Sequence, residues 1–307
     1  MRRIIDGHVH LAGKHEPDWV DPLTGYRHGA YGMLHTPLGS RRRMPPFMAD
    51  SAFSAETLLE VMDEYGVEKS VLMARLESGT GELAVHAVKL CPERIAAAVS
   101  VEIRMDSVQA LSGWYRKGIR VLKFEMRGLN EFYGSVNVDC EEILSLCREA
   151  ERLGMVVVFD PGPIHFPCSQ PQGLKRILDT CRDLKVVICH MGLPRPGLRQ
   201  QPELYRKWKS VVELADCGHV WFDVTAIPDL FDQEGFPYQE GMSYFQELKE
   251  QTGIDRLIWG TDIPGTFQRA TYRQMIRMFE QQEGLTEDEK DRLFYRNADQ
   301  LYFAGPQ

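Results

Sequence analysis

Eight short apolar segments, each followed by a stretch with helical periodicity, constrain the fold of this chain more than any other feature. Most of them are continuous rather than alternating, as in Val156-Val-Val-Phe159 and Val186-Val-Ile188. Continuous apolar strands are typical of parallel sheets, because both faces of such a sheet are covered. We expect strands at residues 3–7, 69–74, 95–101, 119–125, 155–160, 185–190, 220–225 and 256–261. Eight strands alternating with helices predict an α/β fold of the (β/α)8 TIM-barrel type.

An open, doubly wound sheet is the alternative fold, but the chain has no glycine-rich phosphate loop after its first strand, where that fold would place one. Helix ends are marked in the sequence as well. Ser54 is expected to cap a helix that Gly66 ends, Asp139 to cap another, and Thr286 to open a capping box. Since no repeat, low-complexity segment or linker interrupts the pattern, residues 1–307 are predicted to form one domain.

Composition narrows the functional class. The formal net charge of −8 argues against nucleic acid and anionic membranes as partners, which would call for basic patches. The seven cysteines form no Cys-x-x-Cys pair and are expected to be reduced thiols of a cytoplasmic protein. No apolar run approaches the ~20 residues of a membrane helix, and Arg2-Arg3 is followed by only two apolar residues, so no signal peptide is expected.

The segment from residue 11 to residue 54 has little periodicity and many prolines and glycines. A loop of this length inside a compact domain is usually functional or disordered. Its aromatic and basic residues, among them Trp19, Tyr26 and the run Arg41-Arg42-Arg43, favour an ordered structure. We therefore expect a long insertion after the first strand that acts as a lid over the site.

Ionisable residues follow the apolar runs at one end of the predicted barrel, the end where active sites of this fold lie. His8 and His10 are two residues apart, so they project to the same side where the first strand ends. Histidine nitrogen and carboxylate oxygen are zinc ligands. Their convergence predicts a metal or catalytic site. The set comprises His8, His10, Lys123, Glu125, Asp160, His190, Asp223 and Asp262.

Several of these motifs resemble the amidohydrolase superfamily, and in particular its amidohydrolase-related branch of decarboxylases and lactonases. They are His8-Val-His10, Val187-Ile-Cys-His-Met-Gly192, Trp259-Gly-Thr-Asp-Ile-Pro264 and the ending Arg296-Asn-Ala-Asp-Gln-Leu-Tyr-Phe303. The resemblance implies that His8 and His10 bind a divalent metal. It implies that Asp262 is a metal ligand or the general base, and that His190 lies at the metal or polarises the substrate. The branch also includes dimers, so the resemblance suggests a homodimer.

One position departs from the branch, which usually has a histidine at the end of the fifth strand. Asp160 stands there, and a carboxylate can still bind zinc or manganese while lowering the net charge of the site. His165 could substitute, although a simple loop histidine is the favoured interpretation. Lys123 is open to two readings, a carboxylated bridge between two metals or an unmodified lysine that could pair with Glu125. We expect one ion, zinc first and manganese as the alternative, with Asp160 among its ligands.

The first functional hypothesis is a metal-dependent hydrolase of a small, carboxylated, cyclic or ester-like substrate such as a lactone or amide. Asp262 would take a proton from the attacking water, and His190 would stabilise the developing oxyanion. The second hypothesis is a non-oxidative decarboxylase on the same residues. The third is a barrel without catalysis that serves as a binding protein, for which Asp160 is the only support.

A substrate carboxylate needs a cationic partner, and guanidinium binds carboxylate in a bidentate manner. The candidates are Arg41, Arg42 and Arg43 from the long insertion, with Lys123 assisting. A solvated loop is the competing interpretation of the arginine run. The predicted partner is thus a small molecule, with neither nucleic acid nor a membrane involved.

Overall fold

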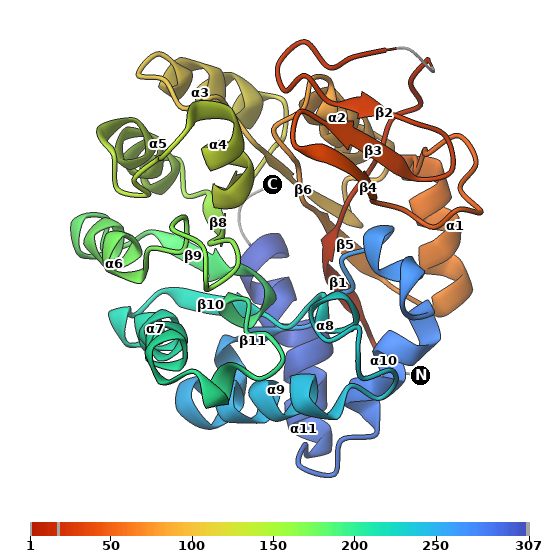
Figure 1. Cartoon of the computed structure of the whole chain (residues 1–307), viewed down its shortest axis with the longest axis vertical. Coiled ribbons are helices and arrows are strands. Elements are labelled where there is room, and N and C mark those ends of the chain that lie inside the picture. Colours follow the sequence, from red (N-terminus) through yellow and green to blue (C-terminus); the bar gives the residue numbers. More distant parts are fainter. Residues whose placement is uncertain (1, 17–18, 305–307) are drawn as a thin grey trace.

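The protein, seen here in a computed structural model that describes residues 2–16 and 19–304, is built on a nearly closed parallel barrel (Figure 1). Eight strands follow one another around it in chain order. The strands are β1 (Ile5–Val9), β5 (Lys69–Leu72), β6 (Ile95–Val99), β7 (Val121–Glu125), β8 (Val156–Asp160), β9 (Lys185–Ile188), β10 (Val220–Asp223) and β11 (Leu257–Ile258). The predicted (β/α)8 barrel is confirmed.

The last strand closes onto the first, although β11 has only two residues. Three backbone hydrogen bonds join the two chain segments, from Gly7 N to the Trp259 carbonyl at 2.9 Å, from Asp262 N to that of His8 at 2.8 Å, and from His10 N to that of Ile263 at 2.8 Å. Val9 and Ile263 form a parallel bridge. The closure thus continues past the end of β11, into the residues that carry the predicted site.

Helices surround the barrel, and most lie where the periodicity predicts them. Ser54 accepts from Thr57 N at the start of the first helix, Gly66 ends it in the left-handed region, and Thr286 forms a capping box with Glu289. The predicted cap at Asp139 is wrong, because this carboxylate accepts from Arg176 and Cys140 stands at the N-cap. The α-helices are α1 (Ala55–Tyr65), α2 (Thr80–Leu90), α3 (Ser107–Arg116), α4 (Met126–Tyr133), α5 (Glu141–Arg152), α6 (Pro171–Thr180), α7 (Pro202–Val212), α8 (Ile227–Leu230), α9 (Gln239–Thr252), α10 (Tyr272–Glu280) and α11 (Glu287–Asp291).

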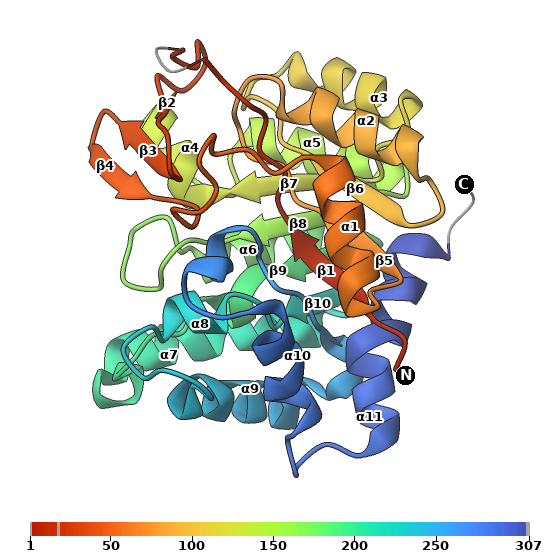
Figure 2. The same ribbon diagram turned by 90° about the vertical axis from the view of Figure 1, so that its right-hand side faces the viewer.

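The long insertion after β1 contains a small antiparallel sheet that the sequence did not predict. Its strands are β2 (Arg27–His28), β3 (Met33–Thr36) and β4 (Gly39–Arg42). Strands of two to four residues are too short to show an alternating pattern, which explains why the segment looked irregular. Figure 2 shows this sheet projecting beyond one end of the barrel.

The core has two parts. One lies between the strands and the surrounding helices, and the other fills the barrel itself. The interior part includes Ile5, Val121, Val187 and Ile258, together with Tyr295, Ala298, Leu301 and Tyr302 from the last helical turns. The C-terminal segment therefore packs into the barrel end opposite the predicted site. Among the described residues, no helix is long and apolar enough to cross a membrane.

Candidate active site

Three predicted residues meet where β1 and β11 end. The Nε2 atoms of His8 and His10 lie 3.3 Å apart, and Asp262 Oδ1 lies 3.2 Å from His10 Nε2 and 3.7 Å from His8 Nε2. Ligands at about 2.0–2.2 Å from a tetrahedral zinc ion are about 3.3–3.6 Å from one another. The three observed distances, 3.2 to 3.7 Å, lie within about 0.1 Å of that range. His8, His10 and Asp262 could together hold a metal ion, and we call them the trio.

The backbone around the trio is fixed by Asp6, which is fully buried beneath it. Its carboxylate accepts from Thr261 N at 2.9 Å, from Thr261 Oγ1 at 2.5 Å, from Tyr272 Oη at 2.6 Å and from His8 N at 3.2 Å. Burial raises the pKa of Asp6 to about 6 despite these bonds. Asp6 thereby joins β1 to the segment that follows β11, and holds His8 and Asp262 at a fixed separation.

The protonation of the trio suits metal binding. Burial, with the nearby Lys123 adding to it, lowers the pKa of His8, and burial with Arg75 lowers that of His10 well below its usual value. Burial alone would raise the pKa of Asp262, but His10 and His8 hold it well below the usual range. Two neutral imidazoles and one carboxylate result, which are the ligand forms that a divalent ion requires.

Two further observations bear on whether these residues fit an ion. Asp262 Oδ1 is buried without a hydrogen-bond partner, a costly arrangement that a cation would relieve. Two cations approach the same histidines, however, with Arg75 Nε donating to His10 Nδ1 at 3.4 Å and Lys123 Nζ lying 3.5 Å from His8 Nε2. Both contacts are long. The trio fits a divalent ion provided that these two side chains draw back.

His190 and Asp160 lie together beside the trio. His190 Nε2 is 3.9 Å from Asp160 Oδ2, and Asp160 Oδ1 accepts from Gly162 N at 2.9 Å. His190 has φ of 55°, in the left-handed region, so the backbone leaves the extended conformation of β9 at this residue. Asp160 is thus placed next to His190 rather than within the trio, whose ligand atoms all lie within 4.8 Å of one another.

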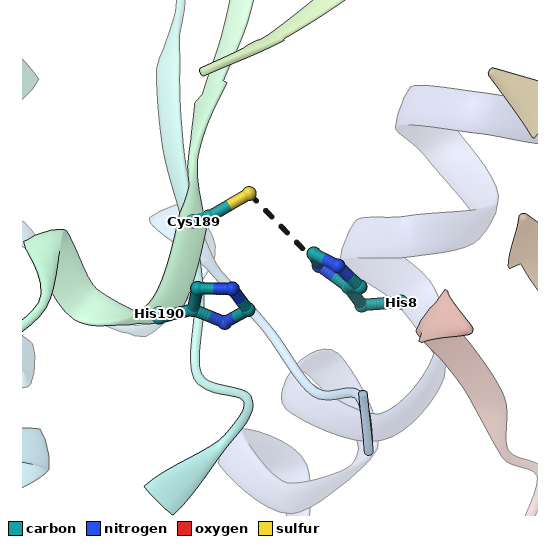
Figure 3. Close-up of side chains that lie close together, drawn as sticks. All are labelled: His8, Cys189 and His190. Carbon is teal, nitrogen blue, oxygen red and sulfur yellow. Dashed lines mark hydrogen bonds between the residues drawn. The ribbon is translucent and has the colours of Figure 1, made fainter. Parts of the chain in front are cut away.

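A second group that could hold a metal is formed by His8, Cys189 and His190, shown in Figure 3. Burial and the neighbouring Asp223 raise the pKa of the Cys189 thiol well above its usual value, so the thiolate form that binds metals is disfavoured. The Cys189 sulfur lies 3.9 Å from His8 Nδ1, the nitrogen that also faces Asp223. The trio is therefore the stronger candidate for a metal site.

Two hollows of different charge open beside these residues. A cavity of about 200 Å³ is lined by several acidic groups, including Asp160, Asp229 and Asp262, with His190 and Arg41. The neighbouring hollow is much smaller, about 20 Å³, and mainly cationic, and its charged lining residues are Arg41, Arg43, Arg75, Lys123, Glu77 and Glu125. Arg41 lines both.

The three arginines predicted to hold a carboxylate differ in their surroundings. Arg41 is exposed and lines both hollows. Arg42 donates to the carbonyl oxygen of Tyr31, and Arg43 is ion-paired with Glu77 at 2.6 Å. Lys123, also predicted to bind substrate, is buried and reaches His8. Of these four cations, Arg41 is the one most open to a ligand.

Several residues that shape the site have no role predicted from the sequence. Arg75 lies three residues beyond the end of β5 and directly after the strand expected at residues 69–74, so the rule that located the other strand-end residues would have found it. Asp223 was noted at a strand end, but its contact with His8, 2.9 Å from carboxylate to ring nitrogen, is visible only in the structure. Asp229 follows no strand, and burial together with Asp262 raises its pKa to about 6.

Comparison with known proteins places the fold and the family. A family model described as amidohydrolase matches residues 5–304. A search of curated protein sequences finds no significant match. Solved structures match over nearly the whole length.

One similar structure, from Acinetobacter baumannii, is assigned as a probable 2-pyrone-4,6-dicarboxylic acid hydrolase and has citric acid bound. Its sequence is 20% identical to this chain, the TM-score is 0.69, and the match covers 98% of this chain and 99% of the other. A zinc-bound amidohydrolase from Burkholderia multivorans is 17% identical with a TM-score of 0.70 and the same coverage. A 5-carboxyvanillate decarboxylase from Sphingomonas paucimobilis is 12% identical with a TM-score of 0.66, again with this coverage. At these identities the likeness concerns the fold.

Proposed function

The chain belongs to the amidohydrolase family, and on that basis we propose that it is a metal-dependent hydrolase of a small carboxylated lactone or amide. The observation that carries the proposal is the trio, in which an unpaired buried carboxylate oxygen faces two neutral imidazole nitrogens. Zinc is the ion that we propose first, because nitrogen and carboxylate ligands at tetrahedral spacing suit it, and manganese is the alternative.

Bound between His8, His10 and Asp262, such an ion would polarise the substrate carbonyl and lower the pKa of a nearby water towards ~7. Asp262 accepts the proton of the attacking water and returns it to the leaving group. His190 keeps one proton on Nδ1, so it would act in its doubly protonated form, in which Nε2, facing the acidic cavity, also carries a proton and donates it to the oxygen on which charge develops. Asp160 remains a predicted metal ligand, and pairing with His190 is its alternative role.

The cationic hollow supports a carboxylated substrate. Arg41 is the proposed primary contact, and Arg75 and Lys123 raise the local positive potential. Arg42 and Arg43, engaged with Tyr31 and Glu77, support the insertion rather than touch the substrate in this proposal. Residues 11–54, whose Arg41 and Arg43 line this hollow, are proposed to cover the site as a lid.

Decarboxylation on the same residues is the second candidate. It is favoured by one observation, that His190 faces the cavity beside Asp160 and could deliver a proton to carbon as carbon dioxide leaves. Product analysis distinguishes the two reactions. Ring opening of lactones supports hydrolysis, and carbon dioxide release from hydroxybenzoates supports decarboxylation.

The test combines metal content with turnover. Purified protein is expected to bind one equivalent of zinc and to open carboxylated lactones from a substrate panel. His8→Ala is expected to lose both properties, while His86→Ala, at an exposed histidine paired with Glu56, keeps both. Wild-type protein that binds no divalent ion after reconstitution would refute the proposed metal site. Together with unchanged ligand binding in His8→Ala, that result would favour the non-catalytic binding protein.

A further inference from the structure

The carboxylate of Asp223, at the end of β10, contacts both histidine-bearing segments of the site. It is almost completely buried. Its Oδ2 lies 2.9 Å from His8 Nδ1, and its Oδ1 accepts from His190 N at 2.6 Å and from Thr225 Oγ1 at 2.5 Å. Thr225 Oγ1 in turn lies 2.6 Å from His190 Nδ1. One side chain therefore connects β1, β9 and β10.

The chemistry of these groups fixes the direction of each hydrogen bond. An ionised carboxylate only accepts, so His8 Nδ1 must donate to Asp223. The Thr225 hydroxyl has a single proton and directs it to Asp223. Its oxygen therefore accepts from His190, which means that His190 Nδ1 also carries a proton.

Both rings are left with Nε2 as the atom available to a ligand. His8 Nε2 belongs to the trio, and His190 Nε2 faces the acidic cavity near Asp160. Figure 3 shows the two rings facing each other across the barrel from β1 and from the turn after β9, and their centroids lie 4.9 Å apart. The tautomers of two side chains 182 positions apart in the sequence thus depend on one carboxylate.

We propose that Asp223 is a positioning residue that sets the Nδ1–H tautomer of His8 directly and of His190 through Thr225, so that both present Nε2 to the ligand and substrate. The part of this proposal in which the Nε2 atoms bind the ion and the substrate rests on the proposed function. The assignment of the two tautomers does not depend on that function. Asp223 touches neither the substrate nor the ion, and it acts through the two histidines.

Long-range ¹H–¹⁵N NMR of protein labelled at histidine reads the tautomers directly. In metal-free wild-type protein, His8 and His190 are each expected to carry a proton on Nδ1, with assignments taken from His8→Ala and His190→Ala. A proton on Nε2 alone in either ring overturns the proposal. This measurement needs no Asp223 variant, so a folding defect cannot obscure it.

Asp223→Asn keeps the shape of the side chain but replaces one acceptor oxygen by a donor. We expect the Nδ1–H signature to be lost in at least one of the two rings, and zinc affinity measured by chelator competition to fall about 10- to 100-fold. Thr225→Val is the matched control. It removes the acceptor of His190 Nδ1 and one donor to Asp223 Oδ1, but leaves the contact between Asp223 Oδ2 and His8. The His190 signature is therefore expected to change, while the His8 signature is retained and the zinc affinity stays within about threefold.

The outcomes separate this inference from the proposed function. Correct tautomers in a protein that neither binds zinc nor hydrolyses lactones would support the role of Asp223 and refute the function. An active zinc enzyme in which Asp223→Asn changes neither ring would support the function and refute the role of Asp223.

Discussion

Replacing Glu77 by glutamine should loosen the insertion from the barrel. Glu77 lies in the loop between β5 and α2, and its carboxylate contacts Arg43 Nη1 at 2.6 Å and His28 Nε2 at 3.0 Å. The side chains of Glu77 and Arg43 are only 10% and 14% exposed. Both partners belong to the insertion, so this ion pair joins β2 and the end of β4 to the barrel.

The expected cost follows from the burial of the pair. Removing one partner of a buried ion pair costs ~3–5 kcal/mol, because the remaining charge is left without compensation. Since both groups retain some contact with solvent, we expect about 3 kcal/mol for Glu77→Gln. Replacing both residues, as in Glu77→Gln with Arg43→Met, should cost less than Glu77→Gln alone, because no unpaired charge remains.

Native-state hydrogen exchange resolved to residues 27–42, together with urea unfolding, measures this loss. The control is Glu82→Gln, which breaks an exposed pair with Lys117 and should change stability by less than about 0.5 kcal/mol. If Glu77→Gln lowers the opening free energy of residues 27–42 by less than about 1 kcal/mol, the pair does not hold the insertion in place.

The same pair predicts a pH dependence. Burial would raise the pKa of Glu77, but Arg43 and His28 lower it far below its usual value. A carboxyl group with a lowered pKa in the folded state adds stability above its unfolded pKa, about 4.3, and loses that stability as the pH falls through this value towards the folded pKa. Protection of residues 27–42 should therefore decrease below about pH 4, and Glu77→Gln should remove most of that change.

Further predictions concern the site. Asp262→Asn should lower kcat about 10²- to 10⁴-fold in steady-state assays, and a smaller loss would exclude it as the general base. Arg75→Met should strengthen zinc binding about fivefold in chelator competition, because the hydrogen bond from Arg75 to His10, worth about 1 kcal/mol, no longer competes with the ion. Weaker zinc binding in this variant would contradict the proposal that Arg75 must draw back before the trio holds an ion. Arg41→Met should raise KM about 10- to 100-fold for carboxylated substrates and leave their uncharged analogues unaffected. Because the pKa values of His8 and His10 are lowered, both rings should stay neutral, and keep zinc bound, as the pH falls below ~6.5 in a titration. Release of zinc at or above that pH would count against neutral imidazoles.

The barrel and the trio could be predicted because they depend on local patterns. Apolar runs define strands, a two-residue spacing places His8 and His10 on one side, and the barrel rule brings Asp262 to the same end. Local patterns also explain the correct caps at Ser54 and Thr286, where the bonding partners lie within three residues.

The failures involve partners distant in sequence. Asp139 was predicted to cap a helix, but Arg176, 37 residues away, takes its carboxylate. The orientation of His8 depends on Asp223, 215 residues later, and no pattern in the sequence connects the two. The antiparallel sheet of the insertion was missed because its strands are shorter than any periodicity can reveal.

The closure of the barrel has a consequence for its thermal resistance. The shortest strand of the barrel, β11, is the one that completes it, and the trio spans this junction with His8 and His10 on one side and Asp262 on the other. A bound ion would therefore be a noncovalent cross-link between the two segments. At a free concentration 100 times its dissociation constant, such a ligand adds about 2.7 kcal/mol to the free energy of unfolding. The chemistry of the site and the heat resistance of the fold would then share one requirement.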